Sequence, residues 1–498
     1  MKNKFIFFII LLTLFLSIST ISASENITDV HGVDEDMDIC SLDNATAEVN
    51  RSATDIRADD VVSYIDLNDN FTVSLTSNGS ALANKTVRLS LDEKLYNKTT
   101  DDFGIAVFDF KLKNGTYAVS YSFAGDDEYL PSNGTATILV KPDIITYLKV
   151  VDKNINYREG LKSIFQLRLV DVNNNPISNQ IVVIIVNGKT YNLTTDGEGV
   201  VSIKLKLKKG TYDINYTFNK TGNYLSSNGT FNITVKTKLD SGNGYWVNKW
   251  DMEKVNLKKL SKLGTKQIFL QHTAFSKYGE AKVLKWIKKA HKYGIKVHIW
   301  LAVFYKDGKY IHAASKKGNY NKKQMNSIIK KAKYYASLDG VDGIHFDYLR
   351  YGGNAYKFKN GTEAINYFVK KACTKVRAVN SECIMSAAVM PEPNDMIKYY
   401  GQDIPTLSKY LDVVIPMVYK GNYHASSKWI KKTTKTFTKQ SNGALIWSGL
   451  QTYKSDWNVK KLSYKALFKD AQYAMKGKAS GVVLFRWGLS QFLNFNKL

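Results

Sequence analysis

Cysteine is scarce in this chain of 498 residues, which contains three. Cys40 lies in an acidic leader, and Cys373 and Cys383 lie in a predicted helix and in the strand after it. Three cysteines are too few for the disulfide framework of a small secreted domain. We expect two buried thiols, with a Cys373–Cys383 bridge as the alternative. The chain has no CxxC pair and no histidine-rich cluster, so we expect neither a bound metal nor a cofactor.

Carboxylates are scarce in the second half of the chain. Residues 241–498 contain 46 Lys and Arg against 15 Asp and Glu, whereas the first 240 residues contain 24 and 29. This imbalance indicates an anionic partner, such as an acidic glycan or cell wall, or else well-solvated lysines on helix faces. The lysines gather on predicted helices without interleaved aromatic residues, so we do not expect nucleic acid as a partner.

Long hydrophobic runs are absent except at the start, where Phe5 to Ile21 is apolar. A basic start before this run and small residues after it are typical of a secretory signal peptide, here residues 1–24. An uncleaved anchor is the alternative, because about 20 apolar residues can span a bilayer. We expect an acidic flexible leader over 25–58 and a secreted protein, associated with the cell surface, without a transmembrane segment after signal cleavage.

One segment of the chain is repeated at a spacing of 95 residues. Residues 96–105 return as 191–200, and Gly-Thr-Tyr at 115–117 returns at 210–212. Period-two alternation and Asn-Gly or Asp-Gly turns predict two β-sandwiches, over 59–142 and 143–238. They resemble the immunoglobulin-like repeats of prokaryotic surface and adhesin-like proteins, including those of methanogenic archaea. The resemblance implies attachment to a cell wall or cell surface; a simple spacer is the alternative that we favour.

From residue 240 to 498, eight apolar strand patterns alternate with basic amphipathic helices. This order predicts an α/β domain with the (β/α)8 TIM barrel fold. Such a barrel should fold and act without the repeats. The strands are expected at 244–247, 266–271, 296–304, 343–350, 383–389, 412–419, 444–451 and 481–487.

Two carboxylates are the candidates for catalysis. Asp347 ends the fourth predicted strand, where barrel enzymes place acids, bases and nucleophiles. Arg350 could keep Asp347 ionised or could form a purely structural ion pair with it. Glu392 follows the fifth strand between Pro391 and Pro393, and apolar surroundings would raise its pKa, as a general acid requires.

Aromatic and hydrogen-bonding residues gather at the predicted strand ends. Sugar rings stack on aromatic faces, and their hydroxyls need fixed polar partners. For any single Trp or His, packing inside the barrel is the simpler alternative. The candidate substrate-binding residues are Trp246, His272, Trp300, Tyr348, Arg350, Met417, Tyr419, His424, Trp447, Gln451, Arg486 and Trp487.

The segment Val341–Arg350, followed by Leu411–Tyr419, resembles the glycoside hydrolase-like barrels of uncharacterised glycosidase families. More distantly it is similar to the chitinase-type barrels of glycoside hydrolase family 18. Leu349 stands where the chitinase pattern has glutamate, and His345 replaces the middle aspartate. The resemblance therefore implies a glycoside hydrolase with a polysaccharide substrate, without implying chitinase chemistry.

Two other functions remain open at this point. The barrel could bind glycan without cleaving it, as part of a surface adhesin. It could also be a cell-wall hydrolase that cuts a peptide or amide bond, although no Cys–His pair or metal-ligand set supports this alternative.

Overall fold

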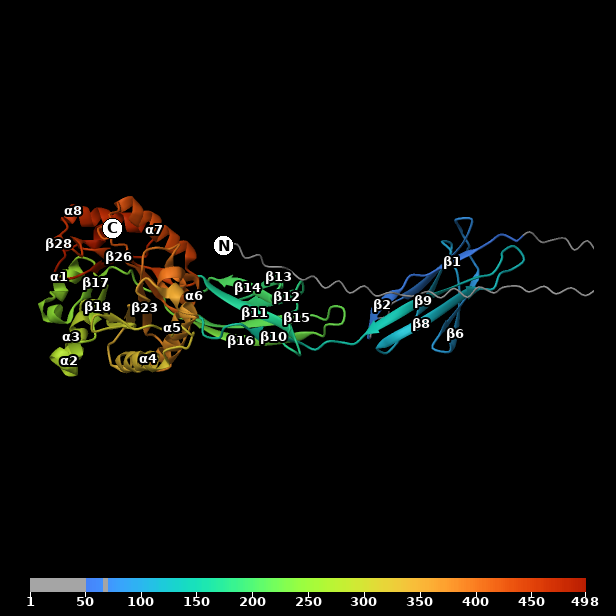
Figure 1. Ribbon diagram of the computed structural model, residues 1–498, viewed down its shortest axis with the longest axis horizontal. Helices are drawn as coiled ribbons and strands as arrows, with labels where there is room; N and C mark the ends of the chain where they lie inside the picture. Colours follow the sequence, from blue (N-terminus) through green and yellow to red (C-terminus); the bar gives the residue numbers. More distant parts are fainter. Residues whose placement is uncertain (1–50, 66–69) are drawn as a thin grey trace, which may run out of the picture.

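The computed structural model describes residues 51–65 and 70–498. The expected signal peptide and most of the expected leader lie outside the described residues. Figure 1 shows two β-modules in line, with a larger α/β domain at one end of the molecule. Over the described part of the chain, no helix combines the length and apolar character that crossing a membrane requires.

Module 1 (residues 55–141) consists of two sheets around one hydrophobic cluster. Strand β3 (Asn70–Ser77) alternates buried and exposed residues, as expected for a strand with one face on a core. One sheet also contains β1 (Asp55–Arg57), β4 (Ser80–Ala81) and β7 (Ile105–Asp109); the other contains β2 (Val61–Tyr64), β5 (Thr86–Leu91), β6 (Lys94–Thr99), β8 (Gly115–Phe123) and β9 (Ser132–Lys141).

Module 2 (residues 146–235) repeats this arrangement around its own cluster. Strand β15 (Gly210–Phe218) corresponds to β8 at the spacing of 95 residues found in the sequence. Its sheets contain β10 (Thr146–Val150), β11 (Ser163–Asp171) and β14 (Val200–Leu205), and β12 (Ile181–Val186), β13 (Lys189–Thr194), β15 and β16 (Ser227–Val235). The predicted internal repeat is therefore confirmed as a repeat of two-sheet β-modules.

One glycine recurs at the same place in both modules. Gly104 and Gly199 have positive φ angles of 74° and 72°. A Cβ atom on either would lie 2.5 Å from a backbone oxygen, of Leu75 or of Leu169. Only glycine fits such a turn, because it has no Cβ and adopts this conformation without strain.

The C-terminal domain is built on one sheet of parallel strands. Its strands are β17 (Gly244–Val247), β18 (Gln267–Gln271), β19 (Lys296–Ala302), β22 (Gly343–Asp347), β23 (Ile384–Val389), β24 (Val413–Pro416), β25 (Leu445–Ile446), β26 (Ser448–Gln451) and β29 (Val482–Phe485). Strands β25 and β26 are two segments separated by Trp447; β25 pairs with β24 and β26 with β29. Because β17 also pairs with β29, the sheet curls into a nearly closed barrel whose neighbouring strands follow the sequence order.

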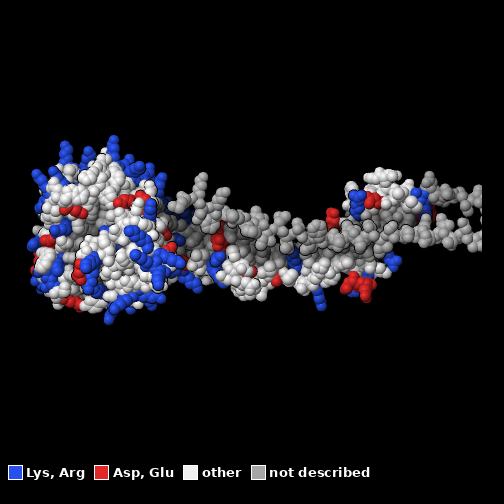
Figure 2. Space-filling view, viewed as in Figure 1, with Lys and Arg blue, Asp and Glu red and all other residues white. Residues whose placement is uncertain are grey.

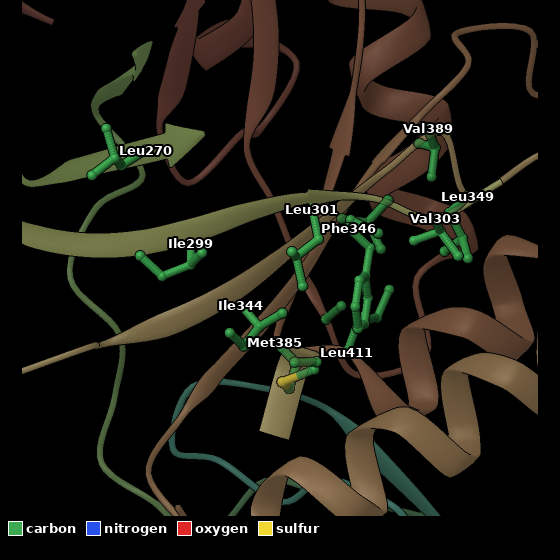
Figure 3. Packing of buried hydrophobic residues seen from close by; sticks show 14 of the residues in the cluster. Leu270, Ile299, Leu301, Val303, Ile344, Phe346, Leu349, Met385, Val389 and Leu411 are labelled. Atoms are coloured by element: carbon green, nitrogen blue, oxygen red, sulfur yellow. The ribbon is translucent and has the colours of Figure 1, made fainter. Parts of the chain in front are cut away.

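Helices cover the outside of this barrel. On β22, Ile344 and Phe346 point outward into the cluster beneath the helices, whereas His345 and Asp347 alternate with them. Figure 3 shows Ile344, Phe346, Ile299 and Leu301 in this outer layer. The helices are α1 (Leu257–Lys262), α2 (Ala274–Tyr278), α3 (Glu280–His291), α4 (Lys322–Ser337), α5 (Gly361–Arg377), α6 (Ile404–Tyr410), α7 (Ser427–Gln440) and α8 (Tyr464–Lys476).

The predicted strands match the barrel strands in order, but several end earlier than expected. Strand β22 ends at Asp347, because Tyr348 takes a left-handed φ of 49° and turns the chain away from the sheet. Cys373 and Cys383 are buried free thiols, as expected.

Module 2 contacts the barrel at the N-terminal ends of the strands. Asp412, which precedes β24, accepts hydrogen bonds from Arg158 Nε at 2.8 Å and Arg377 Nη2 at 2.9 Å. Asn156 Nδ2 donates to the same carboxylate at 2.8 Å. Asp412, Asn156 and Arg158 are all buried. This junction therefore closes the face of the barrel opposite to the strand ends where barrel enzymes place their active sites.

Candidate active site

The C-terminal ends of the strands surround a cavity of about 480 Å³. This volume lies within the range of about 300–1,000 Å³ typical of small-molecule sites. The cavity is lined by Trp246, Gln271, His272, Trp300, Ala302, Tyr305, Asp347, Tyr348, Arg350, Ala388, Met390, Pro391, Met417, Tyr419, Asn422, Tyr423, Asp456 and Phe485.

Asp347 lies at the base of this cavity, at the end of β22. Its Oδ2 accepts a hydrogen bond from Trp300 Nε1 at 3.0 Å, and its Oδ1 accepts one from the backbone N–H of Tyr348 at 2.7 Å. Trp300 reaches it because Ala302 on β19 pairs with Asp347, so Trp300 points to the same side of the sheet.

Burial raises the pKa of Asp347 above its ordinary value, and this effect outweighs the Tyr348 N–H, Arg350 and Trp300, which lower it. Arg350 acts in the expected direction, because it lowers the pKa of Asp347 and so favours the ionised form. Arg350 forms no ion pair with Asp347 among the described residues, so the purely structural ion pair is absent there. Arg350 instead contacts Tyr310, and its guanidinium lies 5.2 Å from the ring centroids of both Tyr310 and Tyr348.

A hydrogen-bonded chain inside the barrel supports Trp246. The indole Nε1 of Trp246 donates to His345 Nε2 at 3.1 Å, and His345 Nδ1 lies 3.0 Å from Ser386 Oγ. Burial holds the pKa of His345 well below its ordinary value, so the ring is neutral. Since its Nε2 accepts the indole hydrogen, its Nδ1 carries the proton and donates to Ser386.

Two tyrosines stack at one side of the cavity. The rings of Tyr305 and Tyr348 lie 4.2 Å apart at 14°. Burial and the nearby Asp347 raise the pKa of Tyr348 to about 12, so its hydroxyl keeps its proton at neutral pH. Opposite, burial with Lys331 and Lys249 lowers the pKa of His272 to about 4, which leaves that ring neutral. The cavity therefore combines neutral hydrogen-bonding groups with flat aromatic faces.

Glu392 lies just behind the cavity wall, next to the lining residue Pro391. Its Oε1 accepts a hydrogen bond from the Tyr423 hydroxyl at 3.0 Å. Its Oε2 is buried and has no hydrogen-bond partner among the described residues. Burial and an interaction with Glu392 raise the pKa of the neighbouring Tyr400, so a second tyrosine hydroxyl lies close to this carboxylate.

Asp456 is the second carboxylate in the cavity wall, and both of its oxygens are engaged. Oδ1 accepts from Gln451 Nε2 at 3.0 Å and from the Tyr453 hydroxyl at 2.9 Å, and Oδ2 accepts from Asn422 Nδ2 at 2.8 Å. These three donors fix the orientation of Asp456 and occupy both of its carboxylate oxygens.

The structure brings part of the predicted site together. Asp347 lines the cavity with seven of the proposed binding residues, Trp246, His272, Trp300, Tyr348, Arg350, Met417 and Tyr419. The residues that do not line it are Glu392, His424, Trp447, Gln451, Arg486 and Trp487.

Four of these residues have other contacts, which correct their expected position. Trp447 is fully buried inside the barrel, where its ring packs against Phe269. Gln451 is buried and orients Asp456 from behind the wall. Arg486 pairs with Asp251 at 3.3 Å, and Trp487 packs against the outer hydrophobic cluster.

His424 lies outside the cavity beside Trp457, with ring centroids 5.6 Å apart. Both adjoin the cavity in sequence, since Tyr423 and Asp456 line it. The cavity also contains Tyr305, Asn422, Tyr423, Asp456 and Phe485, which are not among the residues proposed above for catalysis or substrate binding. The positions of Tyr305, Tyr423 and Asp456 after predicted strands place them at the same rim, although the hairpin that holds Asp456, β27 (Tyr453–Ser455) and β28 (Asn458–Lys461), was not predicted.

Comparison with known families gives one match within the barrel. Residues 301–444 match a family model described as "putative glycosyl hydrolase domain". This segment contains Asp347, Glu392 and Tyr419 and extends from β19 to the loop before β25. It therefore includes both carboxylates that the sequence proposed for catalysis.

Other comparisons cover the chain less specifically. Chicken (Gallus gallus) ovostatin is 34% identical over 79 residues, which are 16% of this chain, and the chain spans 5% of the length of that protein. Among solved structures, an endo-1,4-β-D-mannanase from Thermotoga petrophila has 11% identity and a TM-score of 0.37, covering 49% of this chain and 88% of that chain. A group II chitinase catalytic domain from Ostrinia furnacalis has 12% identity and a TM-score of 0.35, covering 50% and 90%.

Proposed function

We propose that this protein is a glycoside hydrolase that acts on an extracellular polysaccharide. The observation that carries the proposal is Asp347, a carboxylate with a raised pKa at the base of an aromatic-lined cavity. Aromatic faces suit sugar rings, and a carboxylate at this place suits cleavage of a glycosidic bond. The family match of residues 301–444 supports the same reaction class.

Asp347 acts as the base or nucleophile in this proposal. Each of its oxygens faces a group that can only donate a hydrogen bond, namely the Trp300 indole and the Tyr348 backbone N–H. Such donors hold the ionised form in a defined orientation. The raised pKa makes the carboxylate a stronger base than an exposed aspartate.

Glu392 acts as the proton donor. Its buried Oε2 is free of protein partners among the described residues, while Tyr423 orients the other oxygen. Asp456 is the competing candidate, because it lies in the cavity wall, but three donors occupy its oxygens. We assign Asp456 the role of holding Asn422 and the β27–β28 hairpin beside the cavity.

The remaining features give the setting of the proposed reaction. The signal-like start predicts export, and the two modules, which we interpret as immunoglobulin-like, present the barrel away from the cell surface or bind to it. The basic barrel favours an anionic polysaccharide.

The test is the release of new reducing ends from a panel of neutral and acidic polysaccharides, compared with Asp347→Asn. Asn is nearly isosteric with Asp but cannot act as a base, so we expect a loss of about 10³-fold or more with unchanged folding. Tight binding without release by the parent protein would favour a glycan-binding adhesin. New amines in place of reducing ends would favour a peptide or amide hydrolase.

Glu392→Gln and Asp456→Asn form a matched pair that identifies the proton donor. Loss of the donor should slow substrates with poor leaving groups much more than aryl glycosides with good ones, because the latter need little protonation. We expect this dependence for Glu392→Gln alone. The same dependence in Asp456→Asn, with Glu392→Gln near parent activity, would transfer the role to Asp456.

A further inference from the structure

A second polar cavity lies at the junction of module 2 and the barrel. This junction groove has a volume of about 390 Å³ and is lined by Lys162 and Lys204 from module 2 and by Lys435, Lys439 and Lys478 from the barrel. It precedes the N-terminal ends of β25 and β29, so it lies at the opposite end of the barrel from the candidate active site. Figure 2 shows lysine and arginine side chains over the same domain, with fewer acids between them.

The five lysines of the junction groove are exposed and lack counter-charges. None of them takes part in an ion pair with a carboxylate among the described residues. Ammonium groups that converge in a concave site with protein walls produce a focused positive potential. The junction groove therefore favours a ligand that carries several negative charges over a ligand that carries one.

Contacts at the junction hold the two walls of the groove together. Arg158 of module 2 and Asp412 of the barrel form a buried ion pair at 2.8 Å. Beside the groove, the buried Ser163 of module 2 lies close to Gly443, the residue after the lining residue Asn442. The groove is thus a feature of the docked pair of units, and neither unit forms it alone.

The other lining residues indicate the kind of anion. Thr438, Ser441 and Asn442 add hydroxyl and amide groups that can bond to sugar hydroxyls. Among residues 51–65 and 70–498, no aromatic side chain lines this groove, so these residues offer no surface there on which a nucleobase could stack. These features favour an acidic glycan over a nucleic acid, and the choice of a glycan also rests on the proposed function.

We propose that the junction groove binds a linear anionic polysaccharide, one that carries carboxylate or sulfate groups along its chain. This site is separate from the cavity at Asp347 and retains the polymer without cleaving it. In this proposal the lysines of α7 and those of module 2 bind the same ligand. Lysines that only keep a helix face solvated would have no such shared function.

The experiment compares two triple variants of the full chain with equal changes in net charge. Lys162→Gln/Lys435→Gln/Lys439→Gln removes three groove lysines, whereas Lys285→Gln/Lys289→Gln/Lys292→Gln removes three exposed lysines of α3 and its C-terminus that form no ion pair with the described residues. Binding of a labelled oligogalacturonate is measured by fluorescence anisotropy at low and at physiological salt, with dextran as the uncharged glycan and oligothymidylate as another polyanion.

We expect the groove variant to weaken oligogalacturonate binding by about 10-fold and the α3 variant by about 2-fold or less, since a few exposed charge contacts are lost only in the first. If both variants weaken oligogalacturonate binding equally, net charge alone explains the effect, and the proposed binding site at the junction groove is wrong. Tighter binding of oligothymidylate through the same three lysines would overturn the glycan assignment. Absence of oligogalacturonate binding by the parent would overturn the proposal altogether.

A failure of the junction-groove proposal can be distinguished from a failure of the proposed hydrolase function. Anisotropy detects binding whether or not the chain hydrolyses glycans, and the substituted lysines lie far from the cavity at Asp347. If the groove variant binds like its parent while reducing ends are still released, only the junction site is wrong. If binding depends on the groove lysines but no polysaccharide is cleaved, the proposed hydrolase is wrong.

Discussion

At the scale of single residues, the acidity of Asp347 results from opposing effects. Burial favours its protonated form, while the Tyr348 N–H, Arg350 and the Trp300 indole favour the carboxylate. A base must be deprotonated to act, so activity should fall as the pH drops through this raised pKa. The acid limb of the pH–rate profile therefore reports directly on the surroundings of Asp347.

Trp300→Phe tests this interpretation. The change removes the N–H that lowers the pKa of Asp347, so the pKa should rise further and the acid limb of kcat/KM should move to higher pH. Trp487→Phe is the control, because Trp487 does not line the cavity and should leave the limb in place. If the acid limb of kcat/KM stays at the same pH in Trp300→Phe, a group other than Asp347 controls that limb.

The position of Asp347 could be predicted from the sequence, but its partners could not. Alternation along β22 places His345 and Asp347 on the face opposite to Ile344 and Phe346, which the sequence pattern contains. The Trp300 contact depends on the register of β19 against β22, and the loops around Glu392 and Asp456 depend on packing between distant segments. Neither is encoded in local periodicity.

At the scale of elements, the turn before β14 depends on Gly199. An added Cβ would lie 2.5 Å from the Leu169 oxygen, whereas Gly188, also in module 2 and also at positive φ, has no atom within 4 Å of the same position. Gly188→Ala should cost about 1 kcal/mol for the backbone conformation alone. Gly199→Ala should cost at least twice as much, because a backbone shift must relieve the contact.

Denaturant unfolding of the two alanine variants measures this difference. Equal losses of unfolding free energy would mean that the turn between β13 and β14 adapts easily, and that the recurrence of this glycine in both modules has no packing cause. Module 2 was foreseen from its repeat and alternation, while the close approach at Gly199 follows only from the pairing of β11 with β14.

At the scale of the whole molecule, Asp412 links two folding units. Burial alone would raise its pKa, but Arg377 and Arg158 outweigh this and hold the pKa well below its ordinary value. An aspartate with a lowered pKa stabilises the fold above its unfolded-state pKa of about 4, and this contribution is lost as the pH falls through the folded-state pKa. The junction should therefore weaken in acid.

Asp412→Asn should lower the unfolding free energy at neutral pH by about 3–5 kcal/mol, because it leaves the buried Arg158 and the partly buried Arg377 without this negative partner. The variant should also lose less stability than the parent between neutral pH and acid. Thermal unfolding across this pH range is the measurement. A variant with parental stability and parental acid sensitivity would contradict the role of the ion pair.

The same junction bears on the expectation that residues 240–498 fold and act alone, because module 2 contributes contacts to it. A cut at 240 removes Asn156 and Arg158 and leaves Asp412 with Arg377 as its remaining charged partner from this network. We expect the isolated barrel to unfold at a lower temperature than a fragment that begins before module 2. Equal melting temperatures for the two fragments would mean that module 2 does not stabilise the barrel.

The attachment of module 2 to the N-terminal strand ends also determines which end of the barrel remains open to a ligand. The cavity is lined by residues at the other ends of the strands, so it lies at the end of the barrel opposite to the contact with module 2. In the proposed function, a polysaccharide therefore reaches the cavity from the side of the barrel opposite to module 2, so neither β-module stands between the polymer and Asp347.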